Sequence, residues 1–147
     1  MEVKLVDQIP PESIAVKTSA QTWEGAVAVV GDLLVAGGAT TSAYTQEMIE
    51  TVIELGPYIV IAPGFALAHS RPSPSVLRTG LSLATLLEPV DFGSKNDPVR
   101  LIVGLAALDH DAHLEVMKAL AKLLSNPGKI DQLCDAESVE EIQSILA

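Results

Sequence analysis

The chain has 147 residues, of which 48% are hydrophobic and 19% charged, and its formal net charge is −10. These values predict one folded domain over residues 1–147 and not a disordered segment. The acidic balance argues against nucleic-acid binding and against an anionic membrane surface. A single cysteine, Cys134, excludes an internal disulfide and a multi-cysteine zinc site. With no apolar signal core and no run of 18 apolar residues, we expect a cytoplasmic domain without membrane insertion.

Capping and breaking residues predict two helices in the first half of the chain. Thr22 can cap the first, and Gly37-Gly38 ends it. The second begins at Thr41 or Ser42 and ends at Gly56-Pro57, since proline cannot continue the helical hydrogen bonds. Before them, residues 1–20 predict a short strand or arm, a turn and a second short strand.

Short apolar runs predict the strands. Tyr58–Ala62 is apolar and β-branched throughout, which is typical of a strand buried on both faces. Gly80–Leu87 predicts another strand, with a short extension at Pro89–Phe92. Val99–Leu108 is the most apolar run and predicts a central strand. Between these runs, we expect residues 65–75 to form a loop.

Three helices are expected after the central strand. Asp109 or Asp111 can cap the first, which Asn126-Pro127-Gly128 ends. A short helix at Lys129–Cys134 and a last helix opened by a capping box at Ser138–Glu141 follow. The apolar face expected for the first of them consists of Leu114, Met117, Leu120, Ala121 and Leu124. This order of helices and strands predicts an α/β fold, a three-layer α/β/α domain with a mixed central sheet flanked by helices.

The segment Pro63–Pro72 offers a candidate nucleophile. An apolar run leads through a glycine-bearing turn to His69, and Ser70 and Arg71 follow directly. A neutral imidazole nitrogen is a competent nucleophile near pH 7, because its unperturbed pKa is about 6.5. A hydroxyl and a guanidinium beside it can stabilise an anion that forms there. The spacing alone is also consistent with a surface histidine that has no role in chemistry.

His110 and His113 lie where the central strand leads into the next helix. A histidine near a helix N-terminus is favoured in its neutral form, which can donate or accept a hydrogen bond. The His-x-x-His spacing, with Asp109 and Asp111 beside it, also allows a metal pair. Two ligands three residues apart are common by chance, and no further Cys or His cluster completes a tetrahedral zinc site. We therefore expect no metal and no cofactor.

Other nucleophile and phosphate-binding motifs are missing from the sequence. It contains no G-x-x-x-x-G-K-[ST] loop, no G-x-G-x-x-G and no G-x-S-x-G elbow. Cys134 precedes the acidic Asp135-Ala136-Glu137, and acidic neighbours raise the pKa of a thiol. We predict that Cys134 is a packed side chain without a chemical role.

An ordered series of short motifs resembles the EIIA component of the sugar phosphotransferase system, in its mannitol/fructose superfamily. The series is Gly64–His69, Thr79-Gly80, Val90–Gly93, Ala106-Ala107 and His113-Leu114. A second set is similar to the ascorbate-type branch: Thr22-Trp23, Gly31–Ala36, Gly56–Tyr58, His69–Pro72 and Asn96–Val99. The resemblance runs from about residue 13 to the end of the chain.

The resemblance implies a phosphocarrier with a phosphohistidine intermediate. Phospho-HPr passes a phosphoryl group to the position that matches His69, and a cysteine of EIIB then receives it for a sugar that crosses through EIIC. The second active-site histidine of the family matches His113, whereas His110 has no counterpart. Ascorbate or a related sugar is the expected cargo of the system. The alternative is a regulatory EIIA-like protein that controls a kinase, a transporter or a transcription factor. The sequence does not decide whether the protein forms a homodimer.

Two positions depart from the family pattern. Ala68 stands where family members usually place proline, so we expect a looser loop with a working site. Mannitol-type members also carry an active-site arginine ahead of the glycine motif, whereas Glu50–Gly56 has no basic residue. Arg71 is our candidate for that charge, with Ser70 as a second phosphoryl-stabilising group. We also expect an apolar rim around His69, made by Phe65 and Leu67, where both partners dock transiently.

Overall fold

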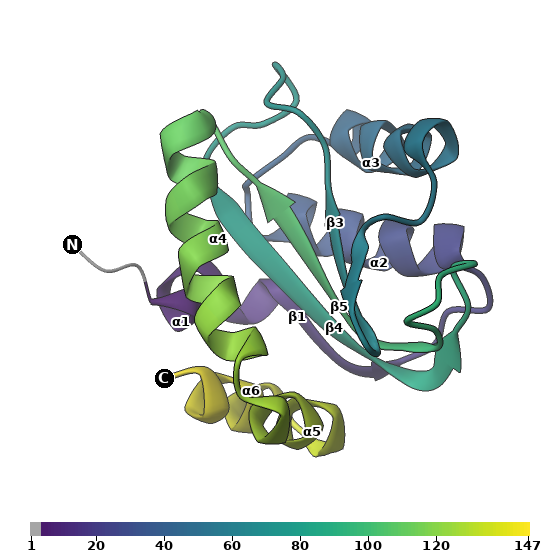
Figure 1. Cartoon of the computed structure of the whole chain (residues 1–147). Coiled ribbons are helices and arrows are strands. Elements are labelled where there is room, and N and C mark those ends of the chain that lie inside the picture. Colours follow the sequence, from purple (N-terminus) through teal and green to yellow (C-terminus); the bar gives the residue numbers. More distant parts are fainter. Residues whose placement is uncertain (1–3) are drawn as a thin grey trace.

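The computed structural model describes residues 4–147, and helices cover both faces of a mixed sheet (Figure 1). This confirms the predicted three-layer α/β/α architecture. The strands are β1 (Ile14–Thr18), β2 (Val60–Ala62), β3 (Phe65–His69), β4 (Gly80–Val90) and β5 (Val99–Ala106). The α-helices are α1 (Leu5–Gln8), α2 (Trp23–Ala36), α3 (Ser42–Leu55), α4 (His110–Leu124), α5 (Pro127–Asp135) and α6 (Val139–Leu146). A 3-10 turn, η1, spans Pro11–Ser13.

The sheet places β5 at its centre, as the apolar run predicted. Its order is β1-β4-β5-β3-β2. β3 runs parallel to β5 with His69 paired to Leu105, whereas β4 is antiparallel to β5. Because β3 and β5 run in the same direction, their carboxyl ends meet at one edge of the sheet, where α/β proteins commonly bind ligands. His69 is the last residue of β3 and therefore lies at this edge.

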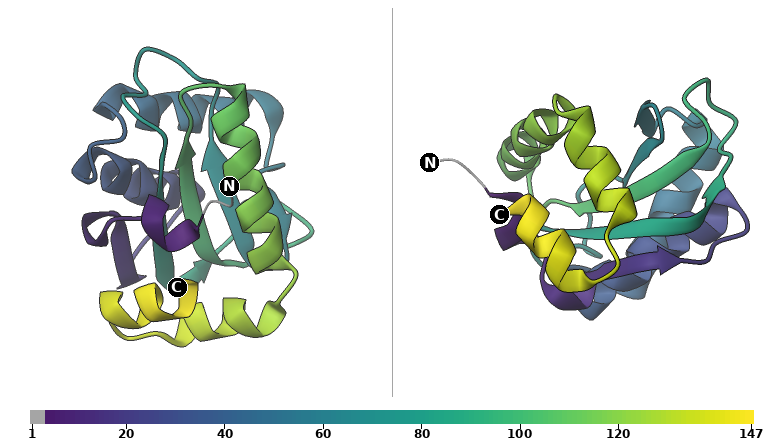
Figure 2. Two further views of the ribbon diagram at one scale, coloured as in Figure 1. Left: turned by 90° about the vertical axis from the view of Figure 1, so that its left-hand side faces the viewer. Right: turned by 90° about the horizontal axis from the view of Figure 1, so that it is seen from below.

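Two helical layers bury the two faces of the sheet (Figure 2). α2 and α3 cover one face through a cluster that includes Ala66, Ala68 and Ile102. The helices α1, α4, α5 and α6 cover the other face, where Phe65 and Leu67 are buried. Among the described residues, none of the helices combines the length and the hydropathy needed to cross a bilayer.

Side-chain caps begin α2, α4 and α6 where the sequence predicts them. The Thr22 hydroxyl accepts the Gly25 N–H at 3.1 Å, and Asp109 accepts the Ala112 N–H at 2.8 Å. The Ser138 hydroxyl caps α6 in the same way. α5 begins at Pro127, earlier than expected, because Asn126 caps it. These starts are predictable because a cap depends only on residues within one turn.

Residues 65–69 correct the prediction of a loop over residues 65–75. Phe65–His69 forms β3, and a turn with Gly64 at φ 76° joins it to β2. A positive φ is accessible to glycine without steric cost, which permits the tight reversal. Large and small side chains alternate along β3, and both kinds are buried. The strand is defined by its pairing with β5, which lies more than 30 residues further along the chain.

The prediction of a strand buried on both faces at Tyr58–Ala62 is wrong in extent and in place. The strand covers only Val60–Ala62 and lies at the sheet edge. Tyr58 is 47% exposed and Ile61 is also exposed. An edge strand has one unpaired side, so an apolar run does not by itself place a strand in the centre.

The first described residues are helical, which corrects the predicted strand or arm. Leu5–Gln8 forms the short helix α1, and Leu5 and Ile9 are both buried in the cluster beneath α4. Ile9 is the extended residue that directly follows this helix. The part of the predicted arm in residues 1–3 lies outside the described residues.

The buried stripe of α4 differs from the predicted one. Val116, Leu120 and Leu123 are buried, whereas Leu114 is 45% exposed. Of the predicted face, only Leu120 is fully buried. The spacing of this stripe, extended back by three residues, reaches His113 in the first turn. The packing of α4 therefore turns His113 toward the sheet.

The contact between α2 and α3 predicts an effect of Gly31 on stability. A Cβ atom at Gly31 would lie 2.8 Å from Thr45 Cβ, a branched atom of α3 that cannot rotate away. We expect Gly31→Ala to lower the free energy of unfolding by about 1–3 kcal/mol through overpacking. Gly25→Ala is the matched control, because its Cβ would meet nothing closer than 3.4 Å. Urea denaturation followed by circular dichroism tests this; equal stability of the two variants would contradict it.

Candidate active site

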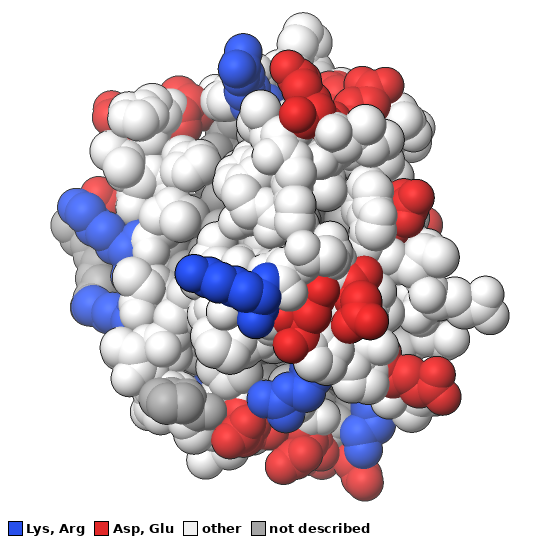
Figure 3. Space-filling model, turned by 45° about the vertical axis from the view of Figure 1, so that its right-hand side comes forward, with Lys and Arg blue, Asp and Glu red and all other residues white. Residues whose placement is uncertain are grey.

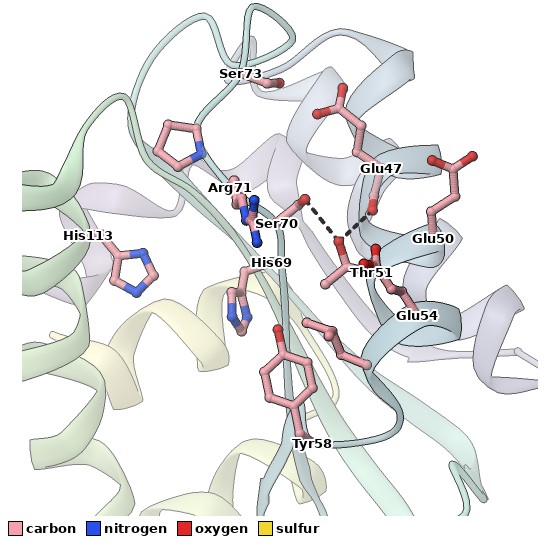
Figure 4. A pocket seen from close by; sticks show the side chains of 12 residues that line it. Glu47, Glu50, Thr51, Glu54, Tyr58, His69, Ser70, Arg71, Ser73 and His113 are labelled. Carbon is pink, nitrogen blue, oxygen red and sulfur yellow. Dashed lines mark hydrogen bonds between the residues drawn. The ribbon is translucent and has the colours of Figure 1, made fainter.

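A pocket of about 500 Å³ opens at the carboxyl ends of β3 and β5 (Figure 4). One wall is α3, another is the segment His69–Ser73, and Tyr58 and His113 complete the lining. All four predicted site residues, His69, Ser70, Arg71 and His113, line it. His110 does not, although it is only three residues from His113.

His69 projects toward the α4 side because it shares a strand face with Phe65 and Leu67. Its Nδ1 lies 2.9 Å from the carbonyl oxygen of Leu67. A carbonyl oxygen can only accept a hydrogen bond, so Nδ1 carries the proton. Nε2 therefore keeps its lone pair, and it is the ring nitrogen that is available for chemistry.

Two aromatic rings flank His69. The ring of His113 lies 6.0 Å from it and that of Tyr58 5.8 Å, centroid to centroid, each at an angle of 82°. This edge-to-face arrangement is a favoured geometry for ring pairs. The imidazole of His69 is thus bounded by one ring from α4 and one from the segment before β2.

His113 is neutral at pH 7. Burial lowers the pKa of His113, and the nearby His69 and His110 lower this pKa further, since a second positive charge is unfavourable there. A neutral imidazole offers one N–H donor and one lone pair. Within residues 4–147, no three His, Cys, Asp or Glu side chains are grouped to hold a metal ion. The His110–His113 pair thus has no third ligand in that part of the chain.

The hydroxyl of Ser70 is directed at α3. Its Oγ lies 3.0 Å from Thr51 Oγ1. Thr51 donates its own proton to the carbonyl oxygen of Glu47 at 2.9 Å, so Ser70 must be the donor in the Ser70–Thr51 pair. To donate to a group bound on His69, the Ser70 hydroxyl has to leave Thr51 by rotation about Cα–Cβ.

Carboxylates dominate the charge of the pocket. Glu47, Glu50 and Glu54 line it from α3, and acidic side chains gather in the upper part of the face shown in Figure 3. Arg71 is the one Lys or Arg among the described residues of the lining. Glu47 also accepts a hydrogen bond from the Ser75 hydroxyl, which ties the segment after His69 to α3. The pocket therefore gives an incoming anion a single guanidinium beside an acidic wall.

Phe65 and Leu67 do not form the predicted apolar rim. Both are fully buried under the helices of the α4 layer, because a strand places alternate residues on the same face. The exposed apolar side chains at the pocket come instead from Leu55 and Tyr58. Leu55 is the last residue of α3, and Tyr58 lies in the segment that joins α3 to β2.

Cys134 is half-buried against the cluster that α4, α5 and α6 cover. Burial raises the pKa of its thiol; Arg100 lowers this pKa, and Asp131 and Asp135 raise it. The acidic neighbours act as predicted, although burial is the larger cause. A thiol with a raised pKa is a poor nucleophile at pH 7.

Residues 7–147 match a protein family described as phosphoenolpyruvate-dependent sugar phosphotransferase system, EIIA 2. The chain belongs to this family. The ascorbate-specific EIIA component of Salmonella typhimurium strain LT2 is 36% identical to this EIIA component, over 98% of this chain and 96% of that protein.

Solved structures of mannitol-type relatives have the same fold as this EIIA component. The mannitol-specific cryptic enzyme IIA of Escherichia coli is 34% identical, with a TM-score of 0.87 over 98% of each chain. A complex of enzyme IIAMtl with phosphorylated enzyme IIBMtl, also from Escherichia coli, matches at 30% identity and a TM-score of 0.81 over 92% of this chain and 94% of that one. This EIIA component is accordingly a phosphotransferase.

Three residues around the site were not singled out from the sequence: Tyr44, Thr51 and Tyr58. Thr51 and Tyr58 act through contacts with Ser70 and His69, which only the folded chain brings near. Tyr44 had a usable signal. It lies on the apolar face of a predicted helix, and a buried tyrosine hydroxyl needs a hydrogen-bond partner.

Proposed function

We propose that this EIIA component accepts a phosphoryl group from phospho-HPr on Nε2 of His69 and passes it to a cysteine of an EIIB component. The observation that supports this most directly is the 2.9 Å contact between Nδ1 and the Leu67 carbonyl oxygen. It holds the proton on Nδ1, so the lone pair that attacks phosphorus is on Nε2. The carbonyl also stabilises the positive charge that the ring gains when Nε2 is phosphorylated.

Bonds and protons balance in both phosphoryl transfers without an added base. In the first, the N–P bond of phospho-HPr breaks as the Nε2–P bond of His69 forms. In the second, a thiolate of EIIB attacks phosphorus and the electron pair of the Nε2–P bond returns to the imidazole. The Nδ1 proton stays in place throughout. Catalysis then consists of in-line positioning and charge stabilisation.

The neighbouring side chains have separable roles in this scheme. His113 is neutral and donates one N–H to a phosphoryl oxygen. Arg71 supplies the positive charge that Glu50–Gly56 lacks in this chain. Ser70 adds a donor after its hydroxyl leaves Thr51.

We infer that residues 1–147 form one type-2 EIIA domain of an ascorbate-type system, acting in the cytoplasm with EIIB and EIIC partners. The ascorbate-specific relatives, at 36% identity, and the mannitol-specific cryptic relative, at 34%, are almost equally similar. The residue pattern supports the ascorbate branch, because the mannitol-type arginine is missing.

A reconstituted phosphotransferase chain tests the proposal. The protein is incubated with phosphoenolpyruvate, enzyme I and HPr, and ³¹P NMR at neutral to mildly alkaline pH distinguishes Nε2-phosphohistidine from the Nδ1 isomer. We expect the Nε2 isomer alone, and its loss when an ascorbate-type EIIB is added. Label on Nδ1 contradicts the assigned nitrogen. Label on His69 that reaches neither ascorbate-type nor mannitol-type EIIB favours the regulatory alternative.

Cys134→Ser is expected to leave both transfers within about twofold of the parent. The thiol lies outside the pocket, and its raised pKa disfavours a reactive thiolate. Rapid-quench measurement of phosphoryl gain and loss checks this. A folded Cys134→Ser protein that cannot transfer the group would overturn the assignment of Cys134 as a packing residue.

A further inference from the structure

Tyr44 of α3 joins the ends of two strands through its hydroxyl group. Its side chain is 0% exposed. Its oxygen accepts the backbone N–H of Ser70 at 2.9 Å and donates to the carbonyl of Leu105 at 2.9 Å. The carbonyl of Ser70 is a second, more distant acceptor at 3.2 Å. The phenol thus relays a hydrogen bond from β3 to β5, starting at the residue that follows His69.

The hydrogen bonds of the Tyr44 hydroxyl lie at the point where β3 and β5 separate, next to His69. His69 and Leu105 are the last paired residues of β3 and β5. Beyond them β3 leaves the sheet, and β5 ends one residue later, at Ala106. The Tyr44 hydroxyl therefore takes the place of a direct backbone bond where the two strands separate. It fixes the backbone on the pocket side of His69, while the Leu67 carbonyl fixes the ring from within the strand.

We propose that Tyr44 is a positioning residue for His69: its hydroxyl holds the Ser70 backbone so that Nε2 stays aligned for phosphoryl transfer. This inference rests on the proposed function. Tyr44 does not line the pocket, so it acts through the backbone and not by contact with phosphorus.

The hydroxyl is suited to a permanent structural bond. Burial raises the pKa of Tyr44 to about 12, so the phenol keeps its proton at every pH at which the protein works. Without the hydroxyl, the Ser70 N–H and the buried Leu105 carbonyl lose the group that joins them. The Ser70 backbone is then no longer tied to β5, and His69 can move with it. A displacement of about 1 Å at a reacting group costs on the order of 10²-fold in rate.

Tyr44→Phe tests this, because it keeps the ring and removes only the oxygen. Ser13→Ala is the matched control: Ser13 is also buried and donates to the Leu33 carbonyl at 2.8 Å, at the other edge of the sheet. Each variant removes one buried hydroxyl group, which makes two hydrogen bonds in Tyr44 and one in Ser13, and we expect both to lower Tm, by roughly 2–8 °C. Only Tyr44→Phe should slow single-turnover transfer from phospho-HPr, by about 10- to 100-fold. The phospho-HPr concentration for half-saturation should stay near that of the parent.

A second readout reports directly on the His69 ring. In the parent and in Ser13→Ala, ¹⁵N chemical shifts of His69 should show one tautomer, protonated on Nδ1. In Tyr44→Phe we expect shifts that move toward averaged values, because release of the Ser70 backbone loosens the contact between His69 Nδ1 and the Leu67 carbonyl. Parent-like shifts together with a parent-like rate in Tyr44→Phe overturn the proposal, as does an equal loss of rate in Ser13→Ala.

A third test uses only the parent protein, so it does not depend on whether a variant folds. The Ser70 amide should exchange with deuterium far more slowly than the amide of Ser73 in the same segment. Equal exchange of the two amides overturns the proposal. If the parent takes no phosphate at all, the proposed function fails and the role of Tyr44 fails with it. If the parent is phosphorylated and Tyr44→Phe behaves identically, only the role of Tyr44 fails.

Discussion

His69→Ala is expected to take no phosphoryl group from phosphoenolpyruvate in the presence of enzyme I and HPr. The substitution removes the proposed nucleophile, so the loss should be complete. The fold should persist, because the His69 side chain is only half-buried and its hydrogen bond lies within its own strand. Mass spectrometry under neutral conditions, which preserve phosphohistidine, measures the label. Retention of label by a folded His69→Ala protein would place the acceptor elsewhere.

His113→Ala is expected to slow phosphoryl transfer by on the order of 10²–10³-fold, since it removes one positioned donor at the transferring group. The His113 ring lies 6.0 Å from that of His69 and is held neutral by its surroundings. It has an N–H to donate and no need to form a covalent bond. Single-turnover kinetics, first with phospho-HPr and then with EIIB, measure each half-reaction separately.

His110→Ala is the control for this prediction. His110 is the first residue of α4 and lies outside the pocket lining, so its removal should leave both rates near those of the parent. Parent-like rates for His113→Ala in both half-reactions would show that the ring does not assist. Complete loss of phosphorylation in a folded His113→Ala protein would place His113 closer to the chemistry than a single donated hydrogen bond does.

Local signals account for the parts of the fold that the sequence predicted well. Thr22, Asp109 and Ser138 each cap a helix with a side chain that reaches no further than its own first turn. The strand β5 follows from the most apolar run of the chain, which is also longer than the run at Tyr58–Ala62. These features need no knowledge of distant partners, so a reader of the sequence can place them.

The missed parts depend on contacts between distant segments. β3 is short, and Gly64 and Pro72 beside it are typical of a loop; its strand character comes from pairing with β5. For the same reason, the contacts of Tyr44 and Thr51 with the segment after His69 were not predicted from the sequence. By contrast, the strand face of His69 follows from simple periodicity once β3 is known. The buried stripe of α4 was mispredicted although the helix itself was expected, because apolar side chains occur at helical spacing on more than one side of it.

In the proposed function, the hydrogen bond from Nδ1 of His69 to the Leu67 carbonyl constrains how phospho-HPr and EIIB use the same site. It leaves one ring nitrogen free, so donor and acceptor must approach the same atom through the same opening. Their binding is therefore mutually exclusive, and each cycle requires the donor to dissociate before the acceptor arrives. Steady-state kinetics should follow a ping-pong scheme, and a large excess of unphosphorylated EIIB should inhibit charging by competition. Fast throughput in such a shuttle favours weak complexes on both sides, because a tightly held partner would block the next transfer.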